Sequence, residues 1–447
     1  MSRSGNGILC ALAALAALAI VSTSPAAALA QDAPAPADSA AADSVLKSAP
    51  AYLSGPGIRV AQSDRGTLNI RVYSYVRYLD QLGLDPTFTD SFGTTKPVQA
   101  RQDMQISKAI VYFMGWFMDP KFRYLFYVWT TNTAQGNGAQ VVVAGNLTYL
   151  FNSHATVGIG INALPGVRST EGNFPNWLST DNRLIADSYF MPSYTTGVWS
   201  AGDIVDGLRY AVMLGNNLSQ LGVDAAQMDN TFDTWSGGIS WMPTTHEFGD
   251  RNGFGDYDRH EKLATRLAGH YTRSSENKQS QPGTEAIENA QIRISDGNIV
   301  FQPGLFGPGI NIEDVRYQMM SYDAGLKYHG LSLDGEFYKR WVDNLRGPGT
   351  DLLPMDVLTD TGVQGQVSAM VVPKALQLYA GASKIYGQYG DPSDYRFGVN
   401  WFPWKTRTAR WNAEMFHVNR SPVGALSLAY PVGGNGNVFY TNFEIDF

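Results

Sequence analysis

The sequence is poor in the features that hold small or extended chains together. Its 447 residues include a single cysteine, Cys10, so no disulfide can form within the chain. Only 16% of the residues are charged, whereas 46 are glycine and 12% are aromatic. The lone cysteine excludes a small scaffold held by disulfides. Low charge with abundant aromatic residues argues against disorder, a coiled coil and an ordinary cytosolic enzyme.

Long hydrophobic runs are equally scarce. Arg3 precedes an uncharged apolar run over residues 8–21, and an Ala-Leu-Ala triplet ending at Ala30 places small residues at cleavage positions. This pattern predicts a secretory signal peptide over residues 1–30. Beyond it, no apolar run approaches the roughly 18 residues that a membrane-spanning helix requires. We therefore expect no helical membrane anchor.

The next segment has the composition of a tether. Residues 31–66 are rich in Ala, Pro, Asp and Ser, as in QDAPAPADSAAADS, and contain few large apolar side chains. Such a segment cannot bury enough surface to fold alone, so we predict a flexible periplasmic leader, with an interaction role as the alternative. The formal net charge of −7 gives no broad affinity for nucleic acid.

After the leader, the sequence alternates with a period of two. In FRYLFYVWT, Phe122, Tyr124 and Phe126 share one face, and Arg123 and Leu125 share the other. This alternation is typical of β-strands. Sixteen such segments are predicted, at 68–78, 103–117, 122–132, 140–151, 155–162, 194–200, 207–215, 232–243, 262–273, 314–328, 331–342, 361–372, 375–387, 395–402, 407–418 and 437–447.

The predicted connections alternate between short and long. Tight turns are expected at 119–121, 152–153, 329–330 and 373–374. Long connections are expected at 79–102, 163–193, 216–231, 274–313, 343–360 and 419–436. Outer-membrane barrels place short turns on the periplasmic side and long loops outside. The connection 244–261 is the exception, because it is long where a short turn is expected.

The two faces of the strands differ in chemistry. In the last strand, Phe439, Phe443 and the terminal Phe447 lie on one face, opposite Asn442 and Glu444. One face suits hydrocarbon and the other suits water, although a soluble β-sandwich would also alternate. The terminal phenylalanine resembles the signal by which Gram-negative outer-membrane barrels are recognised by the barrel assembly machinery.

Aromatic residues on the predicted outward faces favour a membrane barrel over a soluble sheet, because they would form interfacial girdles. They are Tyr112, Trp116, Tyr124, Trp241, Tyr271, Tyr328, Trp341, Trp401 and Trp411. Lys108 and Lys339 interrupt these faces, which a bulge, a register error or a subunit contact would explain. We therefore predict an all-β fold, a transmembrane antiparallel β-barrel over residues 67–447, integral in the lipid of a Gram-negative outer membrane.

Several motifs resemble one family of such barrels. The stretch from Glu171 to Gly222, with EGNFPNWL, DNRLIADSYF, YTTGVW and GLRYAVMLGNNLSQLG, is similar to the phosphate-selective porin O and P family. The motif FGVNWFPW before a return strand and a terminal phenylalanine is similar too, so the resemblance covers about Leu68 to Phe447. It implies a sixteen-stranded barrel, a homotrimer, and a third external loop that folds inward to narrow a channel.

Our strand count places that inward-folded loop at 163–193. The residues predicted to form the pore constriction are Arg168, Arg183, Glu171 and Asp181. A loop folded into the bore would bring these charges to the solute, and charged rings at the narrowest section set selectivity.

The strand faces also predict the charges of the lumen wall. The basic residues are Arg71, Arg77, Arg123, Arg209, Arg266, Lys327, Arg340, Arg396 and Arg410. The acidic residues are Asp323, Asp334, Glu336, Glu414, Glu444 and Asp446. For each arginine, a salt bridge within the wall or a solvated side chain is the alternative to a role in transport. The basic excess is compatible with a modest preference for anions, but it does not establish a phosphate ladder.

Enzymatic motifs are weak. His246-Glu247 and His260-Glu261 lack the second histidine of a zinc site, and the sequence contains neither a GxSxG elbow nor a phosphate-binding loop. The run DRNGFGDYDRHE within 244–261 carries several carboxylates, but Phe254 occupies the third ligand position of a calcium loop. We therefore predict no metal, no cofactor and no enzymatic activity. A hydrolase with a triad assembled from distant strands is the alternative.

These observations predict a porin for passive diffusion of small hydrophilic solutes. A preference for anions such as phosphate stays open. A general or sugar-leaning pore is the alternative within transport, with Tyr73, Tyr75, Tyr127 and Trp129 as a candidate aromatic track. From other classes, a barrel enzyme or a structural outer-membrane anchor stays open.

Overall fold

The computed structural model describes residues 57–131, 140–221, 223, 227–228, 232–281, 291–424 and 428–447. The predicted signal peptide and most of the predicted leader lie outside these residues and stay predictions. Within the described part of the chain, no helix is long and apolar enough to cross a membrane.

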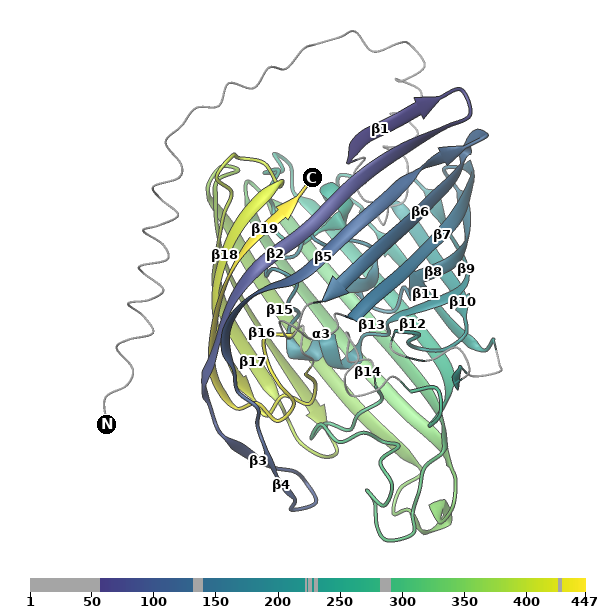
Figure 1. Ribbon diagram of the computed structural model, residues 1–447, viewed down its shortest axis with the longest axis vertical. Coiled ribbons are helices and arrows are strands. Elements are labelled where there is room, and N and C mark those ends of the chain that lie inside the picture. Colours follow the sequence, from purple (N-terminus) through teal and green to yellow (C-terminus); the bar gives the residue numbers. More distant parts are fainter. Residues whose placement is uncertain are drawn as a thin grey trace, which may run out of the picture. The chain divides into compact units, whose positions relative to one another are not determined.

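Among the described residues, sixteen strands close into one antiparallel barrel (Figure 1). Each pairs with the next barrel strand along the chain, and the last pairs with the first. The strands are β2 (Gly66–Leu84), β5 (Gln102–Phe117), β6 (Asp119–Thr131), β7 (Gln140–Asn152), β8 (Ala155–Ala163), β9 (Tyr194–Val205), β10 (Leu208–Gly215), β11 (Thr234–Trp241), β12 (Ala264–Asn277), β13 (Asp314–Tyr328), β14 (Leu331–Arg346), β15 (Val357–Val372), β16 (Leu376–Gly387), β17 (Ser393–Trp401), β18 (Ala409–Asn419) and β19 (Gly436–Asp446). The predicted fold class and strand number are confirmed.

The barrel is closed where its last strand pairs with its first strand. In this seam β19 pairs with β2, with Phe443 opposite Val76. The backbone N–H of Phe447 donates to the carbonyl of Val72 at 3.0 Å, and the N–H of Val72 donates to Phe447 at 2.8 Å. Closure satisfies the backbone groups of both edge strands, as a sheet in lipid requires.

Three short strands lie outside the series of sixteen barrel strands in the described part of the chain. β1 (Ile58–Ser63) pairs with the beginning of β2, although these residues lie within the range predicted as leader. β3 (Thr87–Thr89) and β4 (Thr95–Pro97) form a hairpin in the connection between β2 and β5. This connection, predicted as a loop, therefore contains its own secondary structure.

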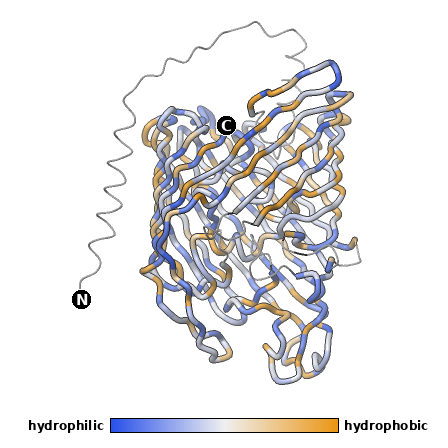
Figure 2. The backbone as a smooth tube through the Cα atoms, in the orientation of Figure 1, coloured by the Kyte–Doolittle hydropathy of each residue, from blue (hydrophilic) through white to orange (hydrophobic). Residues whose placement is uncertain are grey.

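Side chains alternate along the barrel strands as the period-two pattern predicted. On the last strand Val438, Tyr440, Asn442 and Glu444 are buried. Outward-facing apolar side chains are exposed on many strands; among them are Val143, Ile159, Leu333, Phe397 and Met415. Figure 2 shows this alternation of apolar and polar residues along the strands. The outer surface therefore has the character that hydrocarbon tails require.

A register shift in β5 corrects part of the predicted outward face. The pairing of β5 with β2 shifts between Tyr75 and Val76, and both Ser107 and Lys108 are buried beside the shift. Lys108 therefore faces the interior, as a bulge would produce. The same shift turns Tyr112 inward, where it packs with a buried cluster that includes Trp129. The prediction that Tyr112 faces lipid was wrong.

Candidate functional site

The connection between β8 and β9 carries the predicted constriction residues. It contains a short 3-10 turn, η1 (Arg168–Thr170), and one helix, α3 (Ile185–Phe190). Its residues are mostly buried, including every residue of α3. Because loops that face only solvent would stay exposed, this connection must pack against other parts of the protein.

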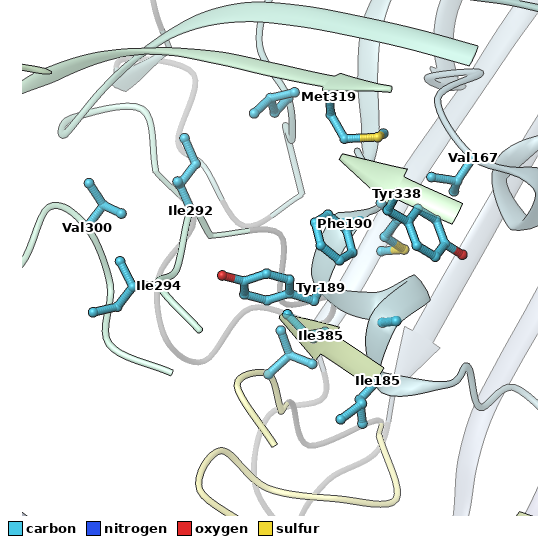
Figure 3. Close-up of a cluster of buried hydrophobic side chains, with 14 of the residues drawn as sticks. Val167, Ile185, Tyr189, Phe190, Ile292, Ile294, Val300, Met319, Tyr338 and Ile385 are labelled. Atoms are coloured by element: carbon cyan, nitrogen blue, oxygen red, sulfur yellow. The ribbon is translucent and has the colours of Figure 1, made fainter. Parts of the chain in front are cut away.

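The packing of α3 involves strands far from its own anchors. α3 contacts β15, β16 and β17. The ring of Phe190 stacks on Tyr338 of β14, with centroids 5.0 Å apart. Figure 3 shows these rings side by side, with Ile385 of β16 nearby. The hydroxyl of Tyr189 donates to the carbonyl of Arg293 at 3.0 Å, so the connection between β12 and β13 also packs on α3.

Arginines of the strands hold the backbone of the same connection. They donate to its carbonyl oxygens: Arg77 to Thr180 at 2.8 Å, Arg396 to Arg183 at 2.6 Å and Arg410 to Trp177 at 2.5 Å. A buried carbonyl without a partner would be costly, so these contacts fix the path of the connection. Three residues predicted for the lumen wall therefore hold the backbone of this connection.

The predicted wall residues are mostly ion-paired. All predicted wall residues are buried except Arg209 and Asp446, which are partly exposed. The pairs are Arg71 with Asp446, Arg209 with Asp203, Arg266 with Asp323, Arg340 with Asp360, Arg396 with Glu414, and Arg410 with Glu444. Lys327 instead donates to the carbonyls of Phe248 and Gly253, both at 2.7 Å. The salt-bridge interpretation therefore fits most of the wall, and a transport role for these residues stays a prediction.

The four predicted constriction residues occupy different environments. Arg168 is 1% exposed and forms an ion pair with Asp334 of β14. Glu171 accepts from Arg266 at 2.6 Å. Asp181 accepts from Lys108 at 2.6 Å, and Arg183 is partly exposed, with its guanidinium 4.4 Å from the Trp177 ring centroid.

A second connection, 244–261, reaches the same region, although it was not predicted to be part of the site. The connection between β11 and β12 lies at the end of the barrel where the other connections are short turns. Its Phe248 and Phe254 side chains are buried. The N–H of Phe254 donates to the carbonyl of Asn176 at 2.8 Å, and Arg251 donates to the carbonyl of Phe174 at 2.6 Å. The unexpected length of this connection was the signal in the sequence that could have revealed it.

An open cavity lies beside these two connections. It measures about 940 Å³ including its mouth and is lined by strands from β5 to β9 together with both connections. Its charged lining residues are Lys108, Asp181, Arg183 and Arg251. A second cavity of about 680 Å³ shares Asn162 with it and includes Glu171 and Arg209. Arg168 is in the lining of neither cavity.

Burial lowers the pKa of Arg251 to about 10, and neighbouring Arg71 adds to this effect. Arg251 therefore remains a cation at neutral pH. With Lys108 and Arg183, it gives the larger cavity three basic side chains against the single carboxylate of Asp181.

No metal centre is evident in the described part of the chain, where no group of three or more His, Cys, Asp or Glu side chains has a suitable arrangement. In the run that raised the calcium hypothesis, Asp256 instead accepts from the ring of His260 at 2.6 Å and from the N–H of Gly330 at 2.7 Å. These contacts tie the β11–β12 connection to the turn between β13 and β14.

No protein-family model and no curated protein sequence matches the chain. Solved structures do match. An anion-selective porin from Comamonas acidovorans has a TM-score of 0.52 at 8% identity, over 86% of this chain and 100% of that chain. OmpF of Salmonella typhi, in complex with daunomycin, has a TM-score of 0.51 at 12% identity, over 87% and 100%. The outer membrane channel DcaP of Acinetobacter baumannii has a TM-score of 0.50 at 8% identity, over 88% and 100%.

At these identities the likeness concerns the fold. The closed sixteen-stranded barrel, with its apolar outer surface, is an integral outer-membrane protein with the fold of the porins. The predicted location is thereby confirmed. Membership of the phosphate-selective porin O and P family is not confirmed.

Proposed function

We propose that the protein is a porin that lets small hydrophilic solutes diffuse passively across the outer membrane. The observation that carries the proposal is the open cavity between the β8–β9 connection and the wall from β5 to β9. In this proposal, the connection is the third external loop, folded inward as the constriction. Solute moves down its gradient, and the rate depends on the bore and the field of the wall, so no enzymatic step or cofactor is needed.

The proposed channel favours anions. Lys108, Arg183 and Arg251 place positive charge in the cavity lining, and Asp181 offsets only one of them. Positive charge at a narrow section lowers the entry barrier for anions. Phosphate is one candidate, which the family resemblance supports. Against a dedicated phosphate ladder, Arg396 and Arg410 are occupied by carboxylates and by backbone carbonyls.

A sugar-leaning pore is the second candidate, because aromatic rings are abundant in the same lining. Assembly as a homotrimer, implied by the family resemblance, is proposed as well. Phe447, the proposed assembly signal, directly follows the seam strand β19, and its backbone is hydrogen-bonded to the backbone of Val72.

Planar-bilayer recordings of the full chain test the proposal. A porin gives large stepwise openings, whereas a barrel enzyme or structural anchor passes almost no current. In a potassium chloride gradient, the reversal potential should show chloride preference in the natural protein. Replacing Arg183 and Arg251 together by glutamine should reduce that preference. Arg346→Gln, which removes a charge from an exposed strand end, is the matched control. An unchanged reversal potential in the double variant would reject the anion filter, and the absence of openings would reject the porin.

A further inference from the structure

The larger cavity has more aromatic surface than the passage of a hydrated ion requires. Its lining includes Tyr112, Tyr127, Trp129, Phe174, Trp177 and Tyr194. The rings of Phe174 and Trp177 are 5.1 Å apart, and those of Tyr112 and Tyr127 are 5.7 Å apart. These rings come from three strands and from the β8–β9 connection, so the aromatic wall exists only in the folded barrel.

The positive charges of the cavity lie against these rings. The ammonium of Lys108 is 4.6 Å from the Trp129 ring centroid and 5.7 Å from that of Phe174. The guanidinium carbon of Arg183 is 4.4 Å from the Trp177 centroid. Arg251 donates to the backbone carbonyl of Phe174. Cation and ring contacts therefore meet around Phe174.

Two buried residues of the lining carry polar atoms that lack hydrogen-bond partners among the described residues. They are the indole Nε1 of Trp129, a residue 6% exposed, and the Oδ1 of Asn146, a residue 5% exposed. Buried polar atoms usually have partners, so such atoms in a cavity wall call for an explanation. A bound carboxylate would accept a hydrogen bond from the indole N–H of Trp129, whereas the Oδ1 of Asn146 is an acceptor and would need a donor such as water.

A cavity that combines aromatic rings with positive charges favours some kinds of anion over others. Aromatic walls cannot replace the hydration shell of inorganic phosphate, whereas a flat apolar ring packs well against them. Pockets that are mainly apolar, with a few placed polar groups, are typical sites for small organic ligands. We propose that this cavity is a binding site for small organic anions that carry a flat ring, such as arene carboxylates. The inference rests on the proposed function and names its solute class.

Benzoate is the probe, and acetate and inorganic phosphate are the comparisons. In planar bilayers with the full chain, benzoate should block the chloride current at concentrations at least about tenfold lower than acetate, since acetate lacks the ring. Phosphate should block less than benzoate. Equal block by benzoate and acetate, or stronger block by phosphate, would overturn the inference.

Substitutions distinguish the contribution of the aromatic rings to anion binding from the contribution of the positive charges. Phe174→Leu should remove the discrimination between benzoate and acetate. Arg251→Gln should weaken the block by both carboxylates by about tenfold, the usual effect of losing a hydrogen bond to a charged group. Trp241→Leu, on the outer face, and Arg346→Gln are the controls and should change neither. An unaltered preference for benzoate in Phe174→Leu would also contradict the site.

Calorimetry of benzoate binding to the detergent-solubilised full chain gives a readout independent of current. The natural protein should bind benzoate, and Phe174→Leu should bind it more weakly. Stepwise, anion-selective openings without benzoate binding would overturn this inference and leave the porin proposal intact. A barrel that passes no current would overturn both.

Discussion

The guanidinium carbon of Arg168 lies 4.3 Å from the ring centroid of Phe254, and this contact joins two connections that begin at opposite ends of the barrel. Arg168 belongs to the β8–β9 connection, and Phe254 belongs to the β11–β12 connection. The same guanidinium pairs with Asp334 of β14. Asn176 reinforces the junction by donating to a carboxylate oxygen of Asp250 at 2.8 Å.

Removing Arg168 should therefore destabilise the barrel rather than simply alter its selectivity. Arg168→Ala leaves the buried carboxylate of Asp334 without its cation, and breaking a buried pair in this way costs about 3–5 kcal/mol. We expect the free energy of unfolding, measured by urea titration in lipid vesicles, to fall by about that amount. The double variant Arg168→Met with Asp334→Leu should recover most of the loss. A single variant as stable as the natural protein would show that the pair is structurally neutral.

The strands could be predicted from sequence because alternation is local. The bounds of β13 were predicted as observed, and the inward or outward face of most side chains follows from the same period. The failures at Lys108 and Tyr112 arise from one register shift, which reverses the faces of the residues that follow it. The charge of Lys108 on a predicted outward face was a sign of this shift, for which a bulge was one of three explanations.

The site was harder to predict because it depends on contacts between distant residues. Arg168 was predicted as a constriction residue, but its environment is decided by Asp334, which lies in another strand. Arg251 was absent from the predicted site because its connection, 244–261, was identified as unusually long but was not predicted to reach the constriction. Only folding brings it beside Phe174.

The β11–β12 connection should be most firmly held in a limited pH range. Burial raises the pKa of Asp256, but hydrogen bonds from His260 and from the N–H of Gly330 together hold it below its usual value. The hydrogen bond to Asp256 raises the pKa of His260, against the opposing effect of burial. The ionised carboxylate of Asp256 stabilises the connection, and this stabilisation is lost as the pH falls through the lowered pKa of Asp256. The protonated ring of His260 also stabilises the connection, and this stabilisation is lost as the pH rises through the raised pKa of His260.

Hydrogen exchange of this connection as a function of pH tests the expectation. Protection should be greatest between the two pKa values and should decrease on either side. Asp256→Asn should remove the pH dependence on the acidic side, whereas Asp258→Asn, at an exposed neighbouring carboxylate, should leave it in place. Protection that rises steadily towards acidic pH would contradict the assigned contacts.

The packing of α3 against β15 can be tested by substitution of Gly362, a β15 residue. A Cβ atom at this position would lie 2.3 Å from the Phe190 ring, whereas a Cβ at Gly335 of β14 would have its nearest neighbour at 3.6 Å. Gly362→Ala should therefore displace α3 at a cost of about 1–3 kcal/mol, and Gly335→Ala should not. Limited proteolysis of residues 164–193 should be faster in Gly362→Ala alone. Equal rates in the two variants would show that α3 is not seated on β15.

The lipid-facing surface can be tested at Phe397, which is 63% exposed on β17 and is paired with Ala380 and Met415 of the neighbouring strands. If this face contacts hydrocarbon, Phe397→Arg must carry a charge into lipid, at a cost of about 2–4 kcal/mol near the bilayer midplane. Phe397→Leu preserves an apolar side chain and is the control, with little expected change. Unfolding in lipid vesicles measures both. An arginine tolerated as well as leucine would mean that water, and not lipid, covers the outside of the barrel.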